Sequence, residues 1–481
     1  TNPDLGLPWK KKKMNSEAIK GLVVAAPASG NGKTTVTLGL LAALKKRGID
    51  TAAFKIGPDF IDPGLHAGIT GRPGRNLDGW MLEPSVNLEI FAGAAHGAGM
   101  AVVEGVMGLY DGFSGLSEAG STAQMAKWLG LPVLLVVDAR SMARSFAALV
   151  KGFSEFDPDV KICGVVANNA ASPNHMQYIK DAMQELPEIP LLGGIPRNAK
   201  ASIPERHLGL FTAQDRVITD ERIDALASIV SENIDLDRLI DLLDPVFVKQ
   251  ASSPAPSDPL VRVAVAKDEA FCFYYEDNMD VLRENGCDIV YFSPLNDQKP
   301  PDNIHGLYLG GGYPELYSHA LYKNTSMRRW VQKMCVSGMP VYAECGGFMY
   351  LCRTLEDQEG NIFEMAGVYA FDTCMQKRLS SLGYREIRLG QNTPLGPAGS
   401  VIRGHEFHYS RIKNPGAEKN AKDVYDSADK TGSQRRASGW LAGRCLGSYV
   451  HLHFKSNPET GSHFADACAQ FKAKGKNPHE T

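Results

Sequence analysis

The 481-residue sequence contains no uninterrupted apolar stretch near the roughly 20 residues that a membrane-spanning helix needs. It has no CxxC pair, and its nine cysteines are an odd number, which argues against a disulfide framework or a zinc site. Reduced thiols are typical of the cytoplasm. No signal peptide precedes the first apolar run. The sequence therefore predicts a cytoplasmic protein with no membrane partner.

A strong charge of either sign is also missing. The 51 Lys and Arg residues and the 54 Asp and Glu residues leave a net charge of -3. An overall field this weak does not attract nucleic acid, so we expect no nucleic-acid partner. A polyanionic ligand would have to be held by a local basic pocket.

The chain is too long for one hydrophobic core, which predicts two domains. Short apolar runs alternate with helical patterns from Gly21 and again from Val261, as in parallel sheets covered by helices. The Pro- and Ser-rich stretch QASSPAPSD separates the two alternations and is the predicted linker. The predicted boundaries are 14–248 for the first domain, 249–259 for the linker and 260–470 for the second domain, with an added extension at 1–13 and a frayed tail at 471–481.

A glycine-rich loop, PASGNGKTT, follows the first apolar run and precedes a helical pattern. Its amides and the helix N-terminus would cradle phosphates, while the lysine would reach the β/γ oxygens. The loop departs from GxxxxGK[ST] because Pro27 stands at the first glycine position. The predicted ATP-binding residues are Gly30, Asn31, Gly32, Lys33, Thr34 and Thr35.

Two acidic residues are candidates for a magnesium site beside this loop. Asp59 follows the second apolar run of the first domain, and Glu104 ends a later one. Ligands gather at the carboxyl ends of parallel strands, and Mg²⁺ prefers oxygen ligands. We therefore predict Thr34, Asp59 and Glu104 as metal ligands; the alternative is that the two acids cap loops.

The segment PVYAECGGFMYL in the second domain predicts a strand, a sharp turn and a helix, with Cys345 at the turn. Small residues flank the cysteine, Ala343 on one side and Gly347 on the other. A nucleophile elbow has this steric requirement. The helix N-terminus is expected to favour the thiolate. A buried structural cysteine is the alternative.

A cysteine nucleophile needs a base, and GSYVHLHF offers His451 and His453. Alternation along a strand places both on one face, so spacing does not choose between them. Upstream, LGGGYPE predicts a strand that ends in a glycine-rich loop with free amides. The predicted oxyanion donors are Gly311, Gly312 and Gly346; a flexible turn is the alternative.

Together these motifs resemble the cobyrinic acid a,c-diamide synthases, whose relatives amidate sirohydrochlorin- or sirohaem-type rings. The resemblance runs from Gly21 to Pro458 and rests on KIGPDFIDPGLH, RNLDGWM, VVEGVMGLYDG, IPERHLGL, LGGGYPE, AECGGFMYL, RGHEFHYS and GSYVHLHF. It implies an α/β chain with a dethiobiotin-synthetase-like P-loop domain, built on a parallel sheet, and a class I glutamine amidotransferase domain. ATP and glutamine would be substrates and Mg²⁺ the cofactor.

The same resemblance implies that Cys345 attacks glutamine and that His451 is its base. Members of the wider class carry His-x-Glu, whereas Leu452 and His453 follow here, so a Cys–His dyad is expected. The implied reaction converts the a and c acetates of cobyrinate into amides through an acyl phosphate.

A ring with many carboxylates requires a pocket with several cations. Solvated arginines and loop histidines with structural partners are the alternative for each candidate. We place Asp62 and His66 in the same loop as Asp59. The predicted substrate contacts are Asp62, His66, Arg75, Asp78, Arg206, Arg385, Arg403, His405 and His408, with Arg378 as a further candidate.

Two other functions stay open from the sequence. In the first alternative, the enzyme carries out the same amidation on sirohaem or nickel-sirohydrochlorin. In the second, the P-loop serves an ATPase switch and the C-terminal domain is inactive. The oligomeric state is open as well, with a homodimer as one option.

Overall fold

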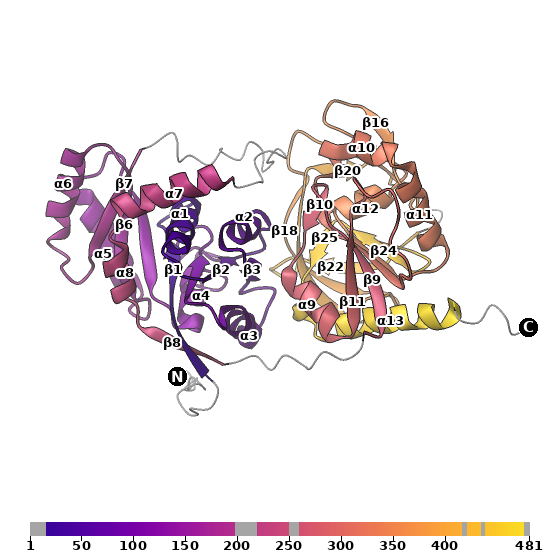
Figure 1. Ribbon diagram of the computed structural model, residues 1–481, viewed down its shortest axis with the longest axis horizontal. Coiled ribbons are helices and arrows are strands. Elements are labelled where there is room, and N and C mark those ends of the chain that lie inside the picture. The colour runs from indigo at the N-terminus through magenta and orange to yellow at the C-terminus, as the bar shows by residue number, and fades with distance from the viewer. Residues whose placement is uncertain (1–15, 198–218, 250–258, 416–420, 434–437, 476–481) are drawn as a thin grey trace, which may run out of the picture. The chain divides into compact units, whose positions relative to one another are not determined.

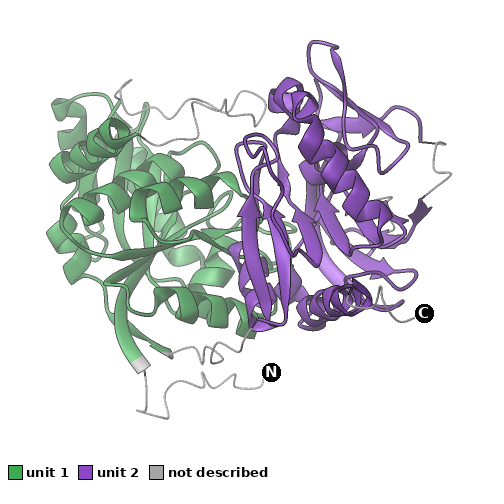
Figure 2. Cartoon of the chain, turned by 45° about the vertical axis from the view of Figure 1, so that its right-hand side comes forward, with its two compact units in different colours: residues 1–252 green, residues 253–481 purple. Residues whose placement is uncertain are grey.

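The computed structural model divides the chain into two compact units, residues 1–252 and 253–481 (Figure 2). The division falls inside the stretch predicted as a linker. Strands and helices alternate in both units (Figure 1), which confirms the α/β class. The structure describes residues 16–197, 219–249, 259–415, 421–433 and 438–475.

The first unit is built on an eight-stranded sheet in the order β3-β2-β4-β1-β5-β6-β7, with β8 paired antiparallel to the start of β1. The other seven strands run parallel, as predicted. The strands are β1 (Ser16–Ala25), β2 (Thr51–Ile56), β3 (Arg75–Leu77), β4 (Met100–Glu104), β5 (Val133–Asp138), β6 (Ile162–Ala170), β7 (Leu191–Pro196) and β8 (Pro245–Lys249).

Helix α1 follows the glycine-rich loop and is buried along most of its length, because its sequence is apolar on nearly every side. Gly39 lets α7 come close, since an added Cβ would lie 2.4 Å from Cγ2 of Val230. The helices of this unit are α1 (Lys33–Lys46), α2 (Ile61–Thr70), α3 (Pro84–Ala95), α4 (Thr122–Leu129), α5 (Arg144–Phe156), α6 (Pro173–Met183), α7 (Asp220–Asn233) and α8 (Leu236–Asp241).

One prediction for this unit is wrong. Asp62 and His66 do not lie in a loop but in helix α2. The helix begins early because the Asp59 carboxylate accepts hydrogen bonds from the backbone amides of Ile61 and Asp62 at 3.1 and 3.2 Å. A carboxylate in this position satisfies amides that have no partner within the helix.

The second unit contains a seven-stranded sheet in the order β11-β9-β12-β14-β24-β23-β21. Its first five strands run parallel, and β23 and β21 add antiparallel pairs. The strands are β9 (Val261–Ala266), β11 (Cys287–Phe292), β12 (Gly306–Leu309), β14 (Val341–Glu344), β21 (Lys422–Asp423), β23 (Gly439–Ala442) and β24 (Cys445–Ser448).

Three smaller sheets complete this unit: β10-β13, β16-β15-β17-β20 and β22-β18-β19-β25. Their strands are β10 (Phe271–Phe273), β13 (Gly311–Gly312), β15 (Thr354–Glu356), β16 (Ile362–Glu364), β17 (Asp372–Met375), β18 (Ser381–Leu389), β19 (Val401–His408), β20 (Ser410–Ile412), β22 (Tyr425–Ala428) and β25 (Val450–Leu452).

The last helix corrects the predicted tail. The helices of the second unit are α9 (Glu276–Glu284), α10 (Ser318–Lys323), α11 (Thr325–Val336), α12 (Gly346–Leu351) and α13 (Glu459–Gly475). The tail was predicted from residue 471, but α13 continues to Gly475 because Ala, Gln and Lys favour helix and Phe464 and Cys468 are buried. Within the described ranges, no helix is long and apolar enough to span a membrane. The nine cysteines are free.

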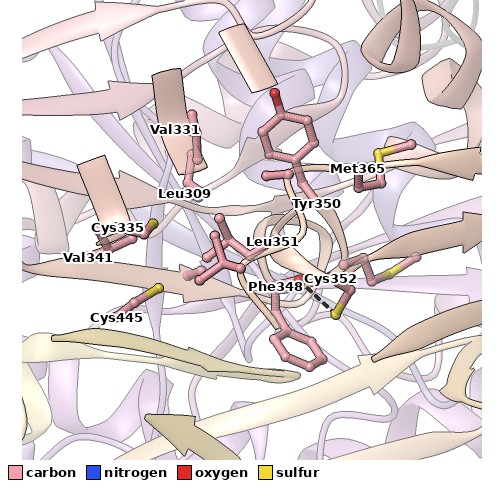
Figure 3. Close-up of a cluster of buried hydrophobic side chains, with 14 of the residues drawn as sticks. Leu309, Val331, Cys335, Val341, Phe348, Tyr350, Leu351, Cys352, Met365 and Cys445 are labelled. Carbon is pink, nitrogen blue, oxygen red and sulfur yellow. Dashed lines mark hydrogen bonds between the residues drawn. The ribbon is translucent and has the colours of Figure 1, made fainter. Parts of the chain in front are cut away.

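Helix α12 is anchored in an apolar core. Figure 3 shows Phe348, Leu351 and Cys352 among side chains of α11 and β14, including Val331 and Val341. Leu351 is fully buried, and the Cys352 thiol donates to the Phe348 carbonyl at 3.3 Å. A helix this short gains little from its own hydrogen bonds, so this packing fixes its position.

Replacing Leu351 with alanine should therefore lower the free energy of unfolding of the second unit by about 2–5 kcal/mol, because it leaves a cavity under α12. Chemical denaturation followed by circular dichroism measures this change. Leu382→Ala is the matched control, since Leu382 is 64% exposed, and it should change the value by less than about 0.5 kcal/mol. Equal effects of the two substitutions would contradict this account of the core.

Candidate active sites

The glycine-rich loop of the first unit is held by the ends of neighbouring strands. Gly30 and Gly32 have φ angles of 80° and 94°, which favour glycine, and Gly32 caps α1. Asn168 donates to the Asn31 carbonyl at 2.9 Å, and the Asn31 side chain accepts from the Asp138 amide at 3.1 Å. A Cβ on Gly32 would lie 2.1 Å from Nδ2 of Asn168. The loop thus has one defined shape at the start of α1.

Lys33 begins helix α1 and folds back over the loop. Its ammonium donates to the carbonyls of Ala28, at 3.2 Å, and of Met107. Burial, followed by repulsion from Lys55, lowers the pKa of Lys33 to about 8. Backbone oxygens therefore hold the lysine in place. Its ammonium form is less stable than in water, and a bound anion would stabilise it.

A buried charge network lies beside the loop, centred on Glu104 at the end of β4. One carboxylate oxygen accepts from Thr34 Oγ1 at 2.6 Å and from Lys55 Nζ at 2.8 Å. The other lies 2.8 Å from His66 Nε2. Asp62 adds an ion pair with Lys55 at 2.7 Å. Burial alone would lower the pKa of Lys55, but Glu104 and Asp62 outweigh it and raise the pKa above its ordinary value.

The three predicted metal ligands are only partly assembled. Thr34 and Glu104 meet directly, whereas the Asp59 carboxylate binds the amides that open α2. Across the described parts of the chain, no group of three or more His, Cys, Asp or Glu side chains is arranged to hold a metal ion. The oxygen donors suit Mg²⁺ chemically, but they need further ligands from elsewhere, as Mg²⁺ sites completed by phosphates do.

In the second unit, Cys345 links β14 directly to α12 through a strained backbone. Its φ and ψ angles are 45° and -99°, outside the regions that non-glycine residues normally adopt. The Cys345 amide donates to the Ser448 carbonyl of β24 at 2.7 Å. A Cβ on Gly347 would lie 2.2 Å from the Leu309 carbonyl oxygen, so the turn requires glycine there. This is the predicted elbow geometry.

The thiolate expected at this helix N-terminus is not what the structure favours. Cys345 is 7% exposed, and burial, together with the nearby Glu315 and Glu406 carboxylates, raises the pKa of its thiol well above the ordinary value. The Gly346 amide acts in the opposite direction but is outweighed by burial. The resting group is a thiol that needs a base.

The predicted glycine loop is a short strand rather than a flexible turn. Gly311 and Gly312 form β13, paired with β10, and the Gly310 amide donates to the Tyr274 hydroxyl at 2.8 Å. Gly312 has a φ of 153°, and a Cβ there would lie 2.1 Å from the Ala270 carbonyl oxygen. A Cβ on Gly346 would lie 3.1 Å from the Gly312 nitrogen. The three predicted oxyanion residues therefore meet in a rigid segment at the elbow.

The two candidate histidines have different surroundings. Strand β25 ends at Leu452, so the alternation used for the prediction does not extend to His453. His451 lies against Gly311, where a Cβ would approach its Cε1 to 2.3 Å. His453 packs on the ring of Tyr275, with centroids 4.6 Å apart. Burial, then His405 and His408, lowers the pKa of His451 well below its ordinary value, so its imidazole is neutral.

Three predicted substrate residues are buried near the glutaminase elbow, in or beside the strand that pairs with β25. The ring of His405 stacks on that of His451 with centroids 5.1 Å apart, and its Nδ1 lies 2.8 Å from the Tyr275 hydroxyl. Arg385 and His408 both bind the Glu406 carboxylate, at 2.9 and 3.0 Å. Burial would raise the pKa of Glu406, but His408 and Arg385 lower it. A charged, buried framework therefore adjoins the elbow.

The other predicted substrate residues are scattered. Asp62 and His66 belong to the Glu104 network, and Asp78 is buried with Oδ1 accepting from the Trp80 and Met81 amides. Arg75 is half-buried at the start of β3, and Arg403 pairs with Glu386 at 2.9 Å. Arg378 is exposed, and Arg206 lies outside the described residues. Apart from Asp62 and His66, the described members of this set are not joined in one network by the hydrogen bonds and ion pairs given above.

Sequence reasoning missed two buried charges, Lys55 and Glu344. Lys55 lies at the centre of the first network, and Glu344 immediately precedes Cys345. Both side chains interrupt strands that are otherwise buried, in AAFKIG and PVYAE. A lone charge in a buried strand was the signal that could have found them, because such a group needs a partner.

Comparisons with known proteins match each unit to a known family. Residues 22–211 match the CobQ/CobB/MinD/ParA nucleotide binding domain, and residues 262–459 match the CobB/CobQ-like glutamine amidotransferase domain. The chain is 43% identical over 451 residues to a cobyrinate a,c-diamide synthase of Syntrophotalea carbinolica, covering 93% of this chain and 98% of that protein. The corresponding protein of Salmonella typhimurium is 42% identical, covering 92% and 97%, and that of Methanosarcina acetivorans is 39% identical, covering 96% and 98%.

Glu104→Gln should destabilise the first unit by about 3–5 kcal/mol, because it leaves the buried ammonium of Lys55 with one carboxylate partner fewer. Chemical denaturation measures the free energy of unfolding. Asp237→Asn is the control, since Asp237 forms an ion pair with Arg47 but its side chain is 83% exposed, and it should cost at most about 1 kcal/mol. A loss at Glu104 no larger than at Asp237 would show that the network contributes little.

Proposed function

This chain belongs to the cobyrinate a,c-diamide synthase family, and we propose that it uses ATP and glutamine to convert the a and c carboxylates of cobyrinate into carboxamides. Residues 14–248 form the synthetase domain, and the amidotransferase domain runs from residue 260 to the end of α13 at Gly475. The observation that carries the proposal is the pair of sites in one chain. One is a phosphate loop with Lys33 and Glu104, and the other is a strained elbow at Cys345, next to the short glycine strand against which His451 lies.

The elbow releases ammonia from glutamine. His451 takes the thiol proton from Cys345, and sulfur bonds to the side-chain carbonyl carbon of glutamine while the amides of Gly312 and Gly346 hold the oxyanion. As the C–N bond breaks, His451 returns the proton to the departing nitrogen. Water then hydrolyses the glutamyl thioester, giving glutamate and the free thiol. A neutral imidazole suits this role, since only the neutral form accepts a proton.

The phosphate loop activates the carboxylate. Its amides and the ammonium of Lys33 bind the β and γ phosphates of ATP, and a ring carboxylate attacks the γ-phosphorus in line to give an acyl phosphate and ADP. Ammonia displaces phosphate and leaves the amide. Thr34 and Glu104 are the residues that would hold Mg²⁺ together with phosphate oxygens, and Asp59 would join them by leaving the α2 amides. Bound there, Mg²⁺ supplies positive charge to the transferring phosphoryl group.

Recognition of the ring is divided among basic residues. Arg75 and Arg403 are half-buried, and each guanidinium group would bind a ring carboxylate. Buried Arg385, His405 and His408 are better placed to shape the glutamine site, because His405 stacks on His451 and the other two bind Glu406, the next residue of β19. The tetrapyrrole is a substrate, so its central metal arrives with it.

Cys345→Ala should abolish amidation of cobyrinate with glutamine as donor and leave amidation with ammonia within about threefold of wild type, because only the first route needs the thiol. Mass spectrometry counts the carboxylates converted in the presence of ATP and Mg²⁺. Lys33→Ala is the complementary variant and should lose activity with both donors.

Parallel incubations with sirohaem and nickel-sirohydrochlorin identify the ring. Conversion of one of them in preference to cobyrinate would overturn the assigned substrate but not the chemistry. Wild-type protein that amidates none of the rings with either donor would refute the proposed function.

Nucleotide affinity should fall as pH rises through about 8. Lys33 loses its proton there in the ligand-free protein, whereas bound phosphates require the ammonium, so binding above this pH must take up a proton. Above this pH, the Kd for the nucleotide should rise by up to about tenfold per pH unit. Isothermal titration calorimetry with ATP between pH 7 and 9 measures it. Lys33→Arg should show a flat profile, because a guanidinium stays charged; an equally flat wild-type profile would contradict the assignment.

A further inference from the structure

A second carboxylate lies next to the histidine of the glutaminase site. Glu344 is the last residue of β14 and directly precedes Cys345. Its side chain is 1% exposed, and its Oε2 lies 3.9 Å from Nδ1 of His451, which is itself 2% exposed. This separation is about half an ångström beyond hydrogen-bonding distance. Catalytic hydrogen bonds are often this long before substrate binds.

The Glu344 carboxylate is held in place by three donors. Oε1 accepts from the Tyr342 hydroxyl at 2.5 Å and from the Leu452 amide at 2.9 Å, and Oε2 accepts from the Tyr308 hydroxyl at 3.0 Å. Leu452 immediately follows His451 in β25. The carboxylate therefore connects the strand that carries the nucleophile to the strand that carries the base, and its position is fixed relative to both.

A purely structural carboxylate is a poor explanation for this arrangement. Removing a carboxylate from water is costly, and a buried position at the end of an apolar strand is usually filled by an apolar residue. The position two residues after the base is occupied by His453, which offers no carboxylate. Glu344 supplies a carboxylate near the base from another strand.

We propose that Glu344 is the positioning residue of the glutaminase site: its Oε2 accepts a hydrogen bond from Nδ1–H of His451, which leaves Nε2 to accept the thiol proton of Cys345. This inference rests on the proposed function, because it assumes that Cys345 attacks glutamine. The carboxylate orients the ring and stabilises the imidazolium that forms, and it takes no proton itself. The expected dyad thereby becomes a triad.

The proposal has a pH signature. Burial raises the pKa of Glu344 to about 7, although its three donors lower it. Below this pH the carboxylate is protonated and no longer stabilises the imidazolium, so glutaminase activity is present above about 7 and lost below it. The groups with charges or titrating protons that face Glu344 are Tyr274, Tyr308, Tyr342 and Tyr425, which stay neutral in this range, together with Cys345 and His451.

The test is glutamate release from glutamine by the full-length protein between pH 5.5 and 9, comparing wild type with Glu344→Gln. The variant should lose about 10²- to 10⁴-fold in kcat with a smaller change in KM. Its remaining activity should not decline near pH 7, since the pKa of His451 lies well below 6.5. Amidation with ammonia should stay within about twofold of wild type. Wild-type kcat in the variant, with the decline near pH 7 intact, would overturn the proposal.

Tyr308→Phe gives an independent readout if Glu344→Gln does not fold, as judged by thermal unfolding. It removes one donor from Oε2 but keeps the carboxylate, so the pKa of Glu344 should rise. The decline of glutaminase activity at low pH should then begin at a higher pH than in wild type. A structural role alone would leave the pH of this decline unchanged. An unchanged pH of decline would therefore overturn the proposal. Wild-type protein without glutaminase activity at any pH would instead refute the proposed function.

Discussion

A turn at one strained residue, Cys345, determines the geometry of the second unit's chemistry. A φ of 45° at a non-glycine residue costs about 1–3 kcal/mol and persists only where its surroundings enforce it. Here the flanking strands do so: Cys345 donates to Ser448 of β24, and Gly347 donates to the Gly310 carbonyl, which follows β12. The short helix beyond the turn is buried in an apolar core. The nucleophile's position is therefore set by the sheet, and the strand before the turn holds the Glu344 carboxylate 3.9 Å from Nδ1 of His451.

The two units solve the problem of buried polar groups in opposite ways. In the first, Lys55 stays charged because Glu104 and Asp62 are its partners, and burial lowers the pKa of Lys33 to about 8. In the second, burial raises the pKa of Cys345 and lowers that of His451, so the pair is neutral. A site that binds phosphates benefits from fixed positive charge. In the resting second site the neutral forms are strongly favoured, so moving the proton requires a group that stabilises the imidazolium as it forms.

Local patterns in the sequence predicted the strands, the phosphate loop and the elbow, because each of these depends on neighbouring residues. Contacts between distant strands could not be read in this way. The placement of His66 on Glu104, 38 residues away, depends on α2 packing over the sheet. The separation of His451 from His453 depends on where β25 ends, which pairing with β19 decides. The thiolate prediction failed for a related reason, since a helix end was visible in the sequence and the depth of Cys345 was not.

The raised thiol pKa of Cys345 suits ammonia production. Ammonia attacks an acyl phosphate only as the neutral molecule, so the departing nitrogen must gain one proton and no more. At rest that proton is on sulfur, and the neutral His451 carries it to nitrogen as the thioester forms. A thiolate paired with an imidazolium would hold the same single proton, but at a greater free-energy cost in a site this dry. Glu344 then has a limited task, which is to lower the free energy of the imidazolium during the transfer without keeping the proton.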